Sequence, residues 1–220
     1  MLFLSPCPPV PPSPTFAQTP NATQILDRAV QAYASVQTLR ADFTQLVRDP
    51  MLDDTQTTRG EFLQQRPNKF AMRWTQPRGD LIVADGQNLW VYLPSSAPNQ
   101  VVRSALAASG STEGIGADIV AEFLDRPQAR FTVTFERAEA VEGRAADVLA
   151  MAPRDRNAPY RRVRIWVDRQ DALVRRVEIT DATGAVRRIT FDRLRTNAAI
   201  PASAFSFQPP RGARVVDASP

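Results

Sequence analysis

The chain of 220 residues is long enough for one sizeable domain with its own core, or at most two small ones. Its 27 Lys and Arg against 23 Asp and Glu leave a net charge of +4 that is spread along the chain, without the clustered cations and aromatic residues of a nucleic-acid-binding protein. Histidine is absent and Cys7 is the only cysteine, which excludes Ser-His-Asp and Cys-His catalysis, an internal disulfide and most transition-metal sites. Hydrolysis by two carboxylates stays formally open, but no acidic pair stands out by its spacing. We therefore expect no enzyme, no cofactor and no metal site.

The first 20 residues, MLFLSPCPPVPPSPTFAQTP, contain too many prolines for an interior helix. We interpret residues 1–20 as a leader, the Pro-rich remnant of a secretory signal, and residues 21–220 as one domain. Ala17 stands where a signal peptidase would cleave, although the stretch lacks a basic beginning and prolines break its apolar run. The LSPC sequence ending at Cys7 resembles a lipidation box, with Pro6 as a poor fit. The sequence thus predicts export and leaves open both the cleavage of the leader and the lipidation of Cys7.

Residues 24–38, QILDRAVQAYASVQT, follow the cap candidates Asn21 and Thr23 and place apolar side chains at helical spacing. The apolar positions are Leu26, Ala29, Val30, Tyr33 and Val36. They share one face, so the sequence predicts an amphipathic helix that covers another element with that face.

The segments after this helix read mostly as strands. LRADFTQLVRD at 39–49 is extended, and GEFLQQRPNKFAMRWTQP at 60–77 forms two alternating segments joined at Arg66 and Pro67. LIVADGQNLWVY at 81–92 is a hairpin with Asp85 and Gly86 in its turn. RFTVTFER alternates at 130–137, and residues 160–195 hold three strands with turns at DRQD and DATG. Roughly ten strands at short intervals predict an antiparallel meander rather than βαβ units.

A short second helix is predicted within GSTEGIGADIVAEFLDRP, residues 110–127, where Asp125 and Pro127 end an apolar run. A sheet of so many strands curls or closes, so we expect an α+β fold in which a curved antiparallel sheet is covered on its concave side by helices. Small barrels fill their interior with side chains, whereas larger or open ones leave room for a ligand. The sequence pattern alone does not decide between these two interiors.

Five stretches, taken in order, resemble the periplasmic lipoprotein carrier family LolA. They are ADFTQ at 41–45, RGEFLQQRPNKFAMRW at 59–74, LIVADGQNLWVY at 81–92, the short helix near 117–125 and FSFQPPRGARVVD at 205–217. Each stretch is weak alone, but the ordered set is specific and covers almost everything from residue 24 onward. The N-terminal region and residues 93–114 differ from the usual family pattern, which leaves the cargo set and the acceptor open.

The resemblance implies an unclosed half β-barrel whose helices form a lid over a hydrophobic cavity for acyl chains. A carrier of this family accepts acylated lipoproteins from an ABC transporter of the inner membrane and ferries them through the periplasm to an outer-membrane acceptor. Exposing one chain of about 16 carbons to water costs on the order of 12 kcal/mol, so shielding the chains would be sufficient without any chemistry. No run of about 20 apolar residues follows the leader, so we expect a soluble periplasmic protein, with a monomer as the default.

The resemblance also implies roles for individual residues. It makes Arg66 a lid latch that bonds to backbone carbonyls of the lid helices, and it places Phe70 on the cavity rim. The residues alone favour a solvated turn arginine at position 66 and leave Phe70 equally open to ordinary strand packing. The candidates for the acyl-chain cavity and its lid, several of which fit a plain sheet core equally well, are Leu26, Val30, Tyr33, Phe62, Phe70, Met72, Trp74, Trp90, Tyr92, Ile119, Phe123 and Leu124.

Arginine pairs at 161–162, 175–176 and 187–188 lie on neighbouring strands and predict a solvated outer face, with a docking surface for acidic partners or lipid headgroups as the alternative. Two other functions compete with the carrier. One is a module that senses mislocalised lipid or lipoprotein on the same half-barrel, and the other is a carboxylate-dependent hydrolase with a buried lipid site. Sensors of this kind add a second domain, whereas this chain ends soon after the closing motif, so the sequence favours the carrier.

Overall fold

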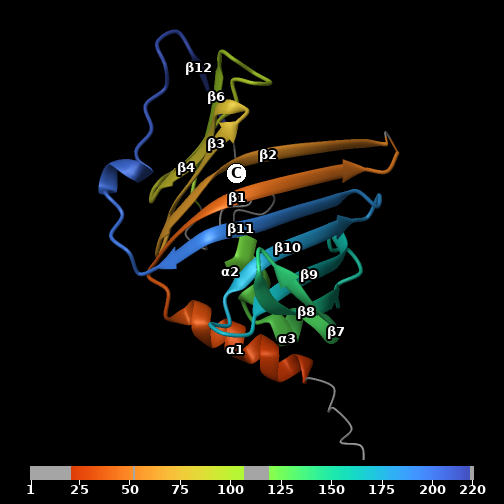
Figure 1. Cartoon of the computed structure of the whole chain (residues 1–220). Coiled ribbons are helices and arrows are strands. Elements are labelled where there is room, and N and C mark those ends of the chain that lie inside the picture. Colours follow the sequence, from red (N-terminus) through yellow and green to blue (C-terminus); the bar gives the residue numbers. More distant parts are fainter. Residues whose placement is uncertain (1–20, 52, 107–118, 219–220) are drawn as a thin grey trace, which may run out of the picture.

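The structure is a computed structural model that describes residues 21–51, 53–106 and 119–218 (Figure 1). The expected leader, with Cys7 and Ala17, lies outside the described residues. The helices are α1 (Ala22–Ala34), α2 (Ile119–Leu124), α3 (Pro127–Arg130) and the short 3-10 helix η1 (Ala202–Phe205). The strands are β1 (Thr38–Asp49), β2 (Asp54–Gln65), β3 (Lys69–Gln76), β4 (Arg78–Asp85), β5 (Asn88–Tyr92), β6 (Gln100–Ala105), β7 (Phe131–Val141), β8 (Arg144–Pro153), β9 (Tyr160–Asp168), β10 (Val174–Asp181), β11 (Val186–Thr196) and β12 (Arg214–Asp217).

The strands form one 12-stranded sheet in the order β12-β6-β5-β4-β3-β2-β1-β11-β10-β9-β8-β7. Neighbouring strands pair antiparallel, except that β12 runs parallel to β6. Among the described strands, the two edges β7 and β12 do not pair with each other, so the sheet curves without closing (Figure 1). This confirms the predicted α+β fold with an unclosed, curved sheet.

The turn residues fix most of the predicted elements. Asp85 accepts hydrogen bonds from the backbone N–H groups of Gln87 and Asn88, both at 2.8 Å, and so closes the predicted β4–β5 hairpin. The side chain of Asn21 caps α1, which therefore begins at residue 22 rather than at the predicted residue 24, and the helix ends at residue 34 rather than 38.

The alternation of apolar residues in the sequence did not predict β6, β8 and β12. Residues 146–149 of β8 are buried on both faces of the sheet, so this strand lacks the alternation by which half-buried strands are recognised.

Both faces of the sheet carry apolar clusters because neighbouring residues of a strand point to opposite sides. The concave cluster, which includes Leu26 of α1 and Phe123 of α2, gathers side chains from the helices and most of the strands. On the outer face, the segment after β11 covers β2–β4, where Phe205 packs with Leu63 and Val83. A second outer cluster surrounds Trp166 and is made by Val141, Ala146, Val148 and Trp166.

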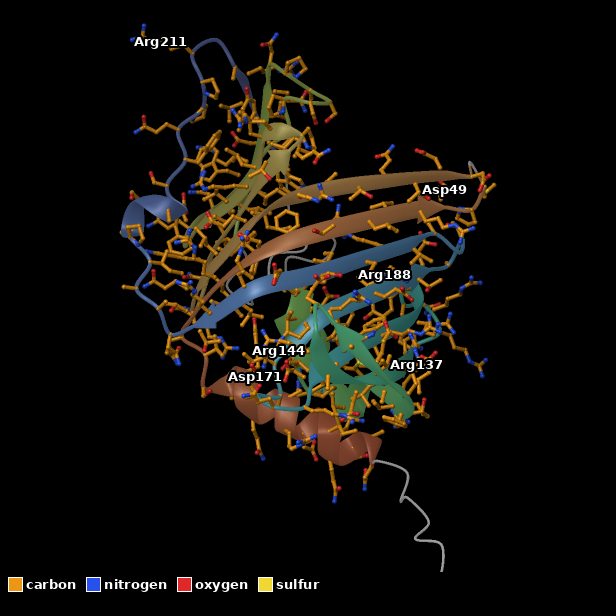
Figure 2. The ribbon with its side chains drawn as sticks, in the orientation of Figure 1. Asp49, Arg137, Arg144, Asp171, Arg188 and Arg211 are labelled. Atoms are coloured by element: carbon orange, nitrogen blue, oxygen red, sulfur yellow. The ribbon has the colours of Figure 1, made fainter. Side chains whose placement is uncertain are left out.

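The predicted solvated face of arginine pairs is only partly correct. Arg161 and Arg162 are exposed, whereas Arg175 is buried at the β9–β10 turn and forms ion pairs with Asp168 and Asp171. Arg144, the first residue of β8, forms ion pairs with the same two carboxylates, and Figure 2 shows it beside Asp171. Arg175 can be buried because the turn presents carboxylates that neutralise it.

We predict that Asp168 makes the stability of the fold depend on pH in the acid range. Burial raises the pKa of this carboxyl, but hydrogen bonds from Arg144, the backbone N–H of Gln170 and Arg175 outweigh it and lower the pKa from 3.8 to about 2. The lowered pKa contributes about 2 kcal/mol of stability above pH 4, which is lost as the pH falls through about 2.

Urea unfolding between pH 5 and pH 2 measures this loss. The Asp168→Asn variant is expected to be less stable at pH 5 and to lose less stability on acidification, while the exposed Asp155→Asn variant controls for the removal of one charge. Equal acid slopes for wild type and Asp168→Asn would contradict the prediction.

We also predict that Gly60 of β2 tolerates no side chain. A Cβ atom there would lie 2.2 Å from the carbonyl oxygen of Arg73 and 2.7 Å from the ring of Phe43, which meets Trp74 edge-on at 5.5 Å between centroids. Gly60→Ala should therefore destabilise the fold by about 1–3 kcal/mol in denaturant unfolding, whereas Thr57→Ala, at an exposed position of the same strand, should change it by less than about 0.5 kcal/mol. Wild-type stability of Gly60→Ala would show that β2 and β3 can separate locally.

Candidate functional site

In the part of the chain that the structure describes, the helices α1, α2 and α3 cover the concave side of the sheet at β7–β10 (Figure 1). The helix α1 contacts β7, β8, β9 and α2, and α2 contacts β10. The side of α1 that faces the sheet buries Ile25, Leu26, Ala29 and Tyr33. Side-chain contacts hold this cover in place, whereas the strands beneath it are joined by backbone hydrogen bonds, so we expect the helices to be the part of the fold that moves as a unit.

Most of the predicted lining residues belong to the concave cluster. Val30 and Trp74 are partly buried and pack against it. The buried members are Leu26, Tyr33, Phe62, Phe70, Met72, Ile119, Phe123 and Leu124. The structure therefore brings these residues together, and their role in holding acyl chains stays a prediction.

Trp90 and Tyr92 lie elsewhere, which corrects the expectation that they line the cavity. Both rings pack against Phe207 of the C-terminal segment, each with 5.9 Å between centroids. The indole N–H of Trp90 donates to Asp85 at 2.9 Å. Leu89 and Val91, which alternate with them in β5, take the concave positions. The two aromatic residues therefore hold the C-terminal segment on the outer face.

A small apolar cavity lies where α1, α2 and the sheet meet. Its volume is about 10 Å³, which is room for about one water molecule. The wall is made by Tyr33, Leu39, Phe62, Val120, Leu173, Val174, Phe191 and Leu194. Of these, only Tyr33 and Phe62 were predicted to line the cavity, because the others are apolar residues with no distinguishing pattern. This cavity is therefore far too small to hold a hydrocarbon chain.

Arg66 lies beside this cavity, in the turn between β2 and β3. Its guanidinium carbon is 4.7 Å from the centroid of the Tyr33 ring, and its backbone N–H donates to the carbonyl oxygen of Gln37 at 2.9 Å. The Tyr33 hydroxyl donates to Oε1 of Gln64 at 2.8 Å. Within the described residues the guanidinium makes no hydrogen bond to a helix carbonyl, so it touches the lid through an aromatic face instead of the expected carbonyls. A cation–π contact is worth about 0.5–2 kcal/mol, depending on how far it is desolvated.

The described residues hold no group of three or more potential metal ligands. None of the helices described here is long and apolar enough to cross a membrane.

The sequence matches the family described as "Outer membrane lipoprotein carrier protein LolA" over residues 34–208. The chain belongs to this family. A protein named "Outer-membrane lipoprotein carrier protein" from Halorhodospira halophila is 30% identical over 188 residues, which cover 86% of this chain and 83% of that protein. A protein of the same name from Leptothrix cholodnii is 34% identical over 183 residues, covering 83% of this chain and 80% of the relative.

Solved structures share the fold at low sequence identity. An uncharacterized conserved protein from Thermus thermophilus has a TM-score of 0.56 at 14% identity, with 90% of this chain and 99% of that chain covered. MucB, in the complex structure of Pseudomonas aeruginosa MucA/MucB, has a TM-score of 0.51 at 19% identity, with 89% of this chain covered. The match spans 63% of that chain. At these identities the likeness concerns the fold alone.

Trp74 and Trp90 lie on opposite faces of the sheet, so we predict that a lipid bound on the concave face quenches the fluorescence of only one of them. In variants that retain one of these two tryptophans, with Trp166→Phe in both, a brominated fatty acid bound on the concave face should quench Trp74 fluorescence and leave Trp90 fluorescence nearly unchanged. The physical reason is that Trp74 packs against the concave cluster, whereas Trp90 packs against Phe207 on the other side. Equal quenching of both residues would mean that the probe binds outside the concave face.

Proposed function

We propose that residues 21–220 act as one carrier domain that shields the acyl chains of lipoproteins and ferries them through the periplasm. The cargo would come from an ABC transporter of the inner membrane and pass to an acceptor at the outer membrane. Membership of the LolA family supports this proposal. The structural observation that carries it is the concave cluster, a large apolar face of an unclosed sheet that is covered by helices.

The small volume of the cavity beside Tyr33 implies that loading an acyl chain there requires movement of the lids. A bound acyl chain needs far more space than one water molecule, so side chains of α1 and α2 must withdraw from the sheet. Each CH₂ group transferred from water contributes roughly 0.8 kcal/mol, so burial of the chains can offset the apolar lid surface exposed by this movement. Such a carrier needs no covalent step, and we propose that it acts without one.

Release of cargo from membranes tests the carrier directly. Inner-membrane vesicles that contain a labelled lipoprotein and an energised lipoprotein-releasing transporter would be incubated with the protein and then sedimented. We expect labelled, intact lipoprotein in the supernatant together with the protein. A supernatant without lipoprotein would contradict the carrier, as a sensing module predicts, and cleaved lipoprotein would point to a hydrolase.

The contact of Arg66 with Tyr33 predicts a role for Arg66 in closing the lid. Arg66→Leu should leave the fold and loading intact but slow the transfer of cargo to the acceptor by about tenfold, because a contact worth up to about 2 kcal/mol no longer favours the empty, closed state. Transfer rates to acceptor-containing membranes measure this effect.

Two variants sharpen the test of Arg66. Arg66→Lys keeps a cation near the ring and should retain part of the activity, while Arg59→Leu removes an exposed arginine from β2, the strand that precedes the turn, and should transfer at the wild-type rate. The latch role would be refuted if Arg66→Leu emptied its cargo as fast as the wild type.

A further inference from the structure

One arginine of β11 faces the concave side of the sheet. Arg187 alternates with Ile189 and Phe191, which both belong to the concave cluster. Across the sheet it pairs with Val47 of β1 and Ile179 of β10. A permanently charged side chain therefore stands among apolar residues of the proposed acyl-chain site.

The guanidinium of Arg187 is only partly satisfied. Its Nε donates to Oε1 of Gln45 at 3.2 Å, and this is its one hydrogen bond within the described residues. Burial lowers the pKa of Arg187, and the negative charge of Glu122 in α2 acts in the opposite direction. Arginine has five N–H donors, so both terminal nitrogens can bind a further acceptor.

The neighbouring arginine, Arg188, has a closer counter-charge than Arg187 has. Arg188 points to the outer face, where its Nε donates to Glu178 at 2.8 Å, and Figure 2 shows its position on that strand. Thus the outward arginine has a carboxylate within hydrogen-bond distance, whereas the inward one has an amide and a more distant counter-charge on a lid helix. A desolvated cation is costly unless it finds acceptors, so the inward position is suited to a ligand that brings them.

An acylated lipid brings such acceptors. Its hydrocarbon tails have none, and the oxygens that accompany the tails into an apolar site are the ester carbonyls at the glycerol. We propose that Arg187, oriented by Gln45, hydrogen-bonds the ester carbonyl oxygens of the diacylglyceryl group of the bound lipid. This inference rests on the proposed carrier function and adds to it a polar anchor that fixes how the lipid lies.

The position of the anchor also gives the lipid a direction. Thr38 of β1 pairs with Gln65, next to Arg66, while Val47 pairs with Arg187, roughly 30 Å further along the strand. The small apolar cavity lies at the Arg66 end, beside Tyr33. A lipid anchored at Arg187 therefore extends its tails towards that cavity, and its esters supply acceptors to the cation when α2 moves away with the negative charge of Glu122.

The test compares an ester-linked phosphatidylglycerol with its ether-linked analogue, which has the same headgroup and chain length but lacks the carbonyls. Binding of each lipid is measured by displacement of a fluorescent fatty acid from wild type, Arg187→Gln and Arg188→Gln. Wild type and Arg188→Gln should bind the ester about tenfold more tightly than the ether, because hydrogen bonds to a charged donor are lost with the carbonyls. Arg187→Gln should bind both lipids equally.

Each other outcome has a distinct meaning. An ester preference that survives in Arg187→Gln overturns the anchor, and so does an equal loss of both lipids, which assigns Arg187 to the headgroup or to folding. Wild-type protein that binds neither lipid contradicts the proposed function itself. A further arm of the experiment measures the binding of a synthetic diacylglyceryl-cysteine peptide. If Arg187→Gln weakens the binding of this peptide, the anchor serves lipoprotein cargo. If Arg187→Gln affects only the binding of phosphatidylglycerol, the anchor serves phospholipid.

Thermal unfolding without lipid separates binding from folding. Because Arg187 is partly buried and poorly compensated within the described residues, Arg187→Gln should unfold at a Tm equal to or above that of the wild type. Arg187→Lys, which keeps the charge but has fewer donors, should retain part of the ester preference with an unchanged Tm. A lowered Tm with an unchanged ester preference would leave Arg187 with a structural role alone.

Discussion

Alternation of side chains along a sheet that does not close is the constraint on which the rest of the structure depends. Each strand presents side chains to both faces of the sheet, and the two faces are covered by different parts of the chain. Outside, the C-terminal segment covers β2–β4 through Phe205, while charged side chains cover β7–β11. Inside, α1 and α2 cover the apolar cluster. The fold therefore joins an outer cover of packed rings and ion pairs to an inner cover of helices, which is held by packing and by a few side-chain contacts such as that of Tyr33 with Gln64.

The outer face is rigid because its charges are arranged as a network. Glu178, which is 4% exposed, accepts hydrogen bonds from Arg164 and Arg188, both at 2.8 Å. The guanidinium groups of Arg137 and Arg176 lie over Trp166. A buried carboxylate with two charged donors tolerates little displacement, because losing either donor leaves charge uncompensated. The strands of this half of the sheet can thus stay in register while the helices move.

Local sequence signals predicted much of this fold. The turns at Asp85 and in the DRQD and DATG segments predicted their hairpins, because an Asp side chain that accepts backbone N–H groups closes such turns without long-range help. The face of a strand is harder to predict. Alternation separates Trp90 from Leu89, but it does not say which of the two meets the helices, and the decisive partner of Trp90 is Phe207, far along the chain. For the same reason the sequence did not single out Arg187 from its pair.

The contact between Arg66 and Tyr33 illustrates the same limit at the candidate site. The sequence places a cation at the β2–β3 turn and an aromatic residue on α1, but only the folded sheet brings Gln37 and Arg66 within hydrogen-bond distance and lays the guanidinium on the ring. The family resemblance drew attention to Arg66, yet the group that it touches here differs from the expected carbonyls. A resemblance can therefore mark a position while the chemistry at that position is set by the particular chain.

The contacts made by Arg66 and Arg187 are weaker than the burial of apolar surface that would hold a lipid. Burial of one chain of about 16 carbons is worth on the order of 12 kcal/mol, whereas a cation–π contact contributes at most about 2 kcal/mol. Neither Arg66 nor Arg187 can therefore supply the affinity for cargo. What such weak, directional contacts can do is bias an equilibrium, one between closed and open lids and the other between orientations of the lipid. Because burial of apolar surface is non-directional, a carrier built on it alone would hold its cargo without controlling how the cargo lies or when it leaves.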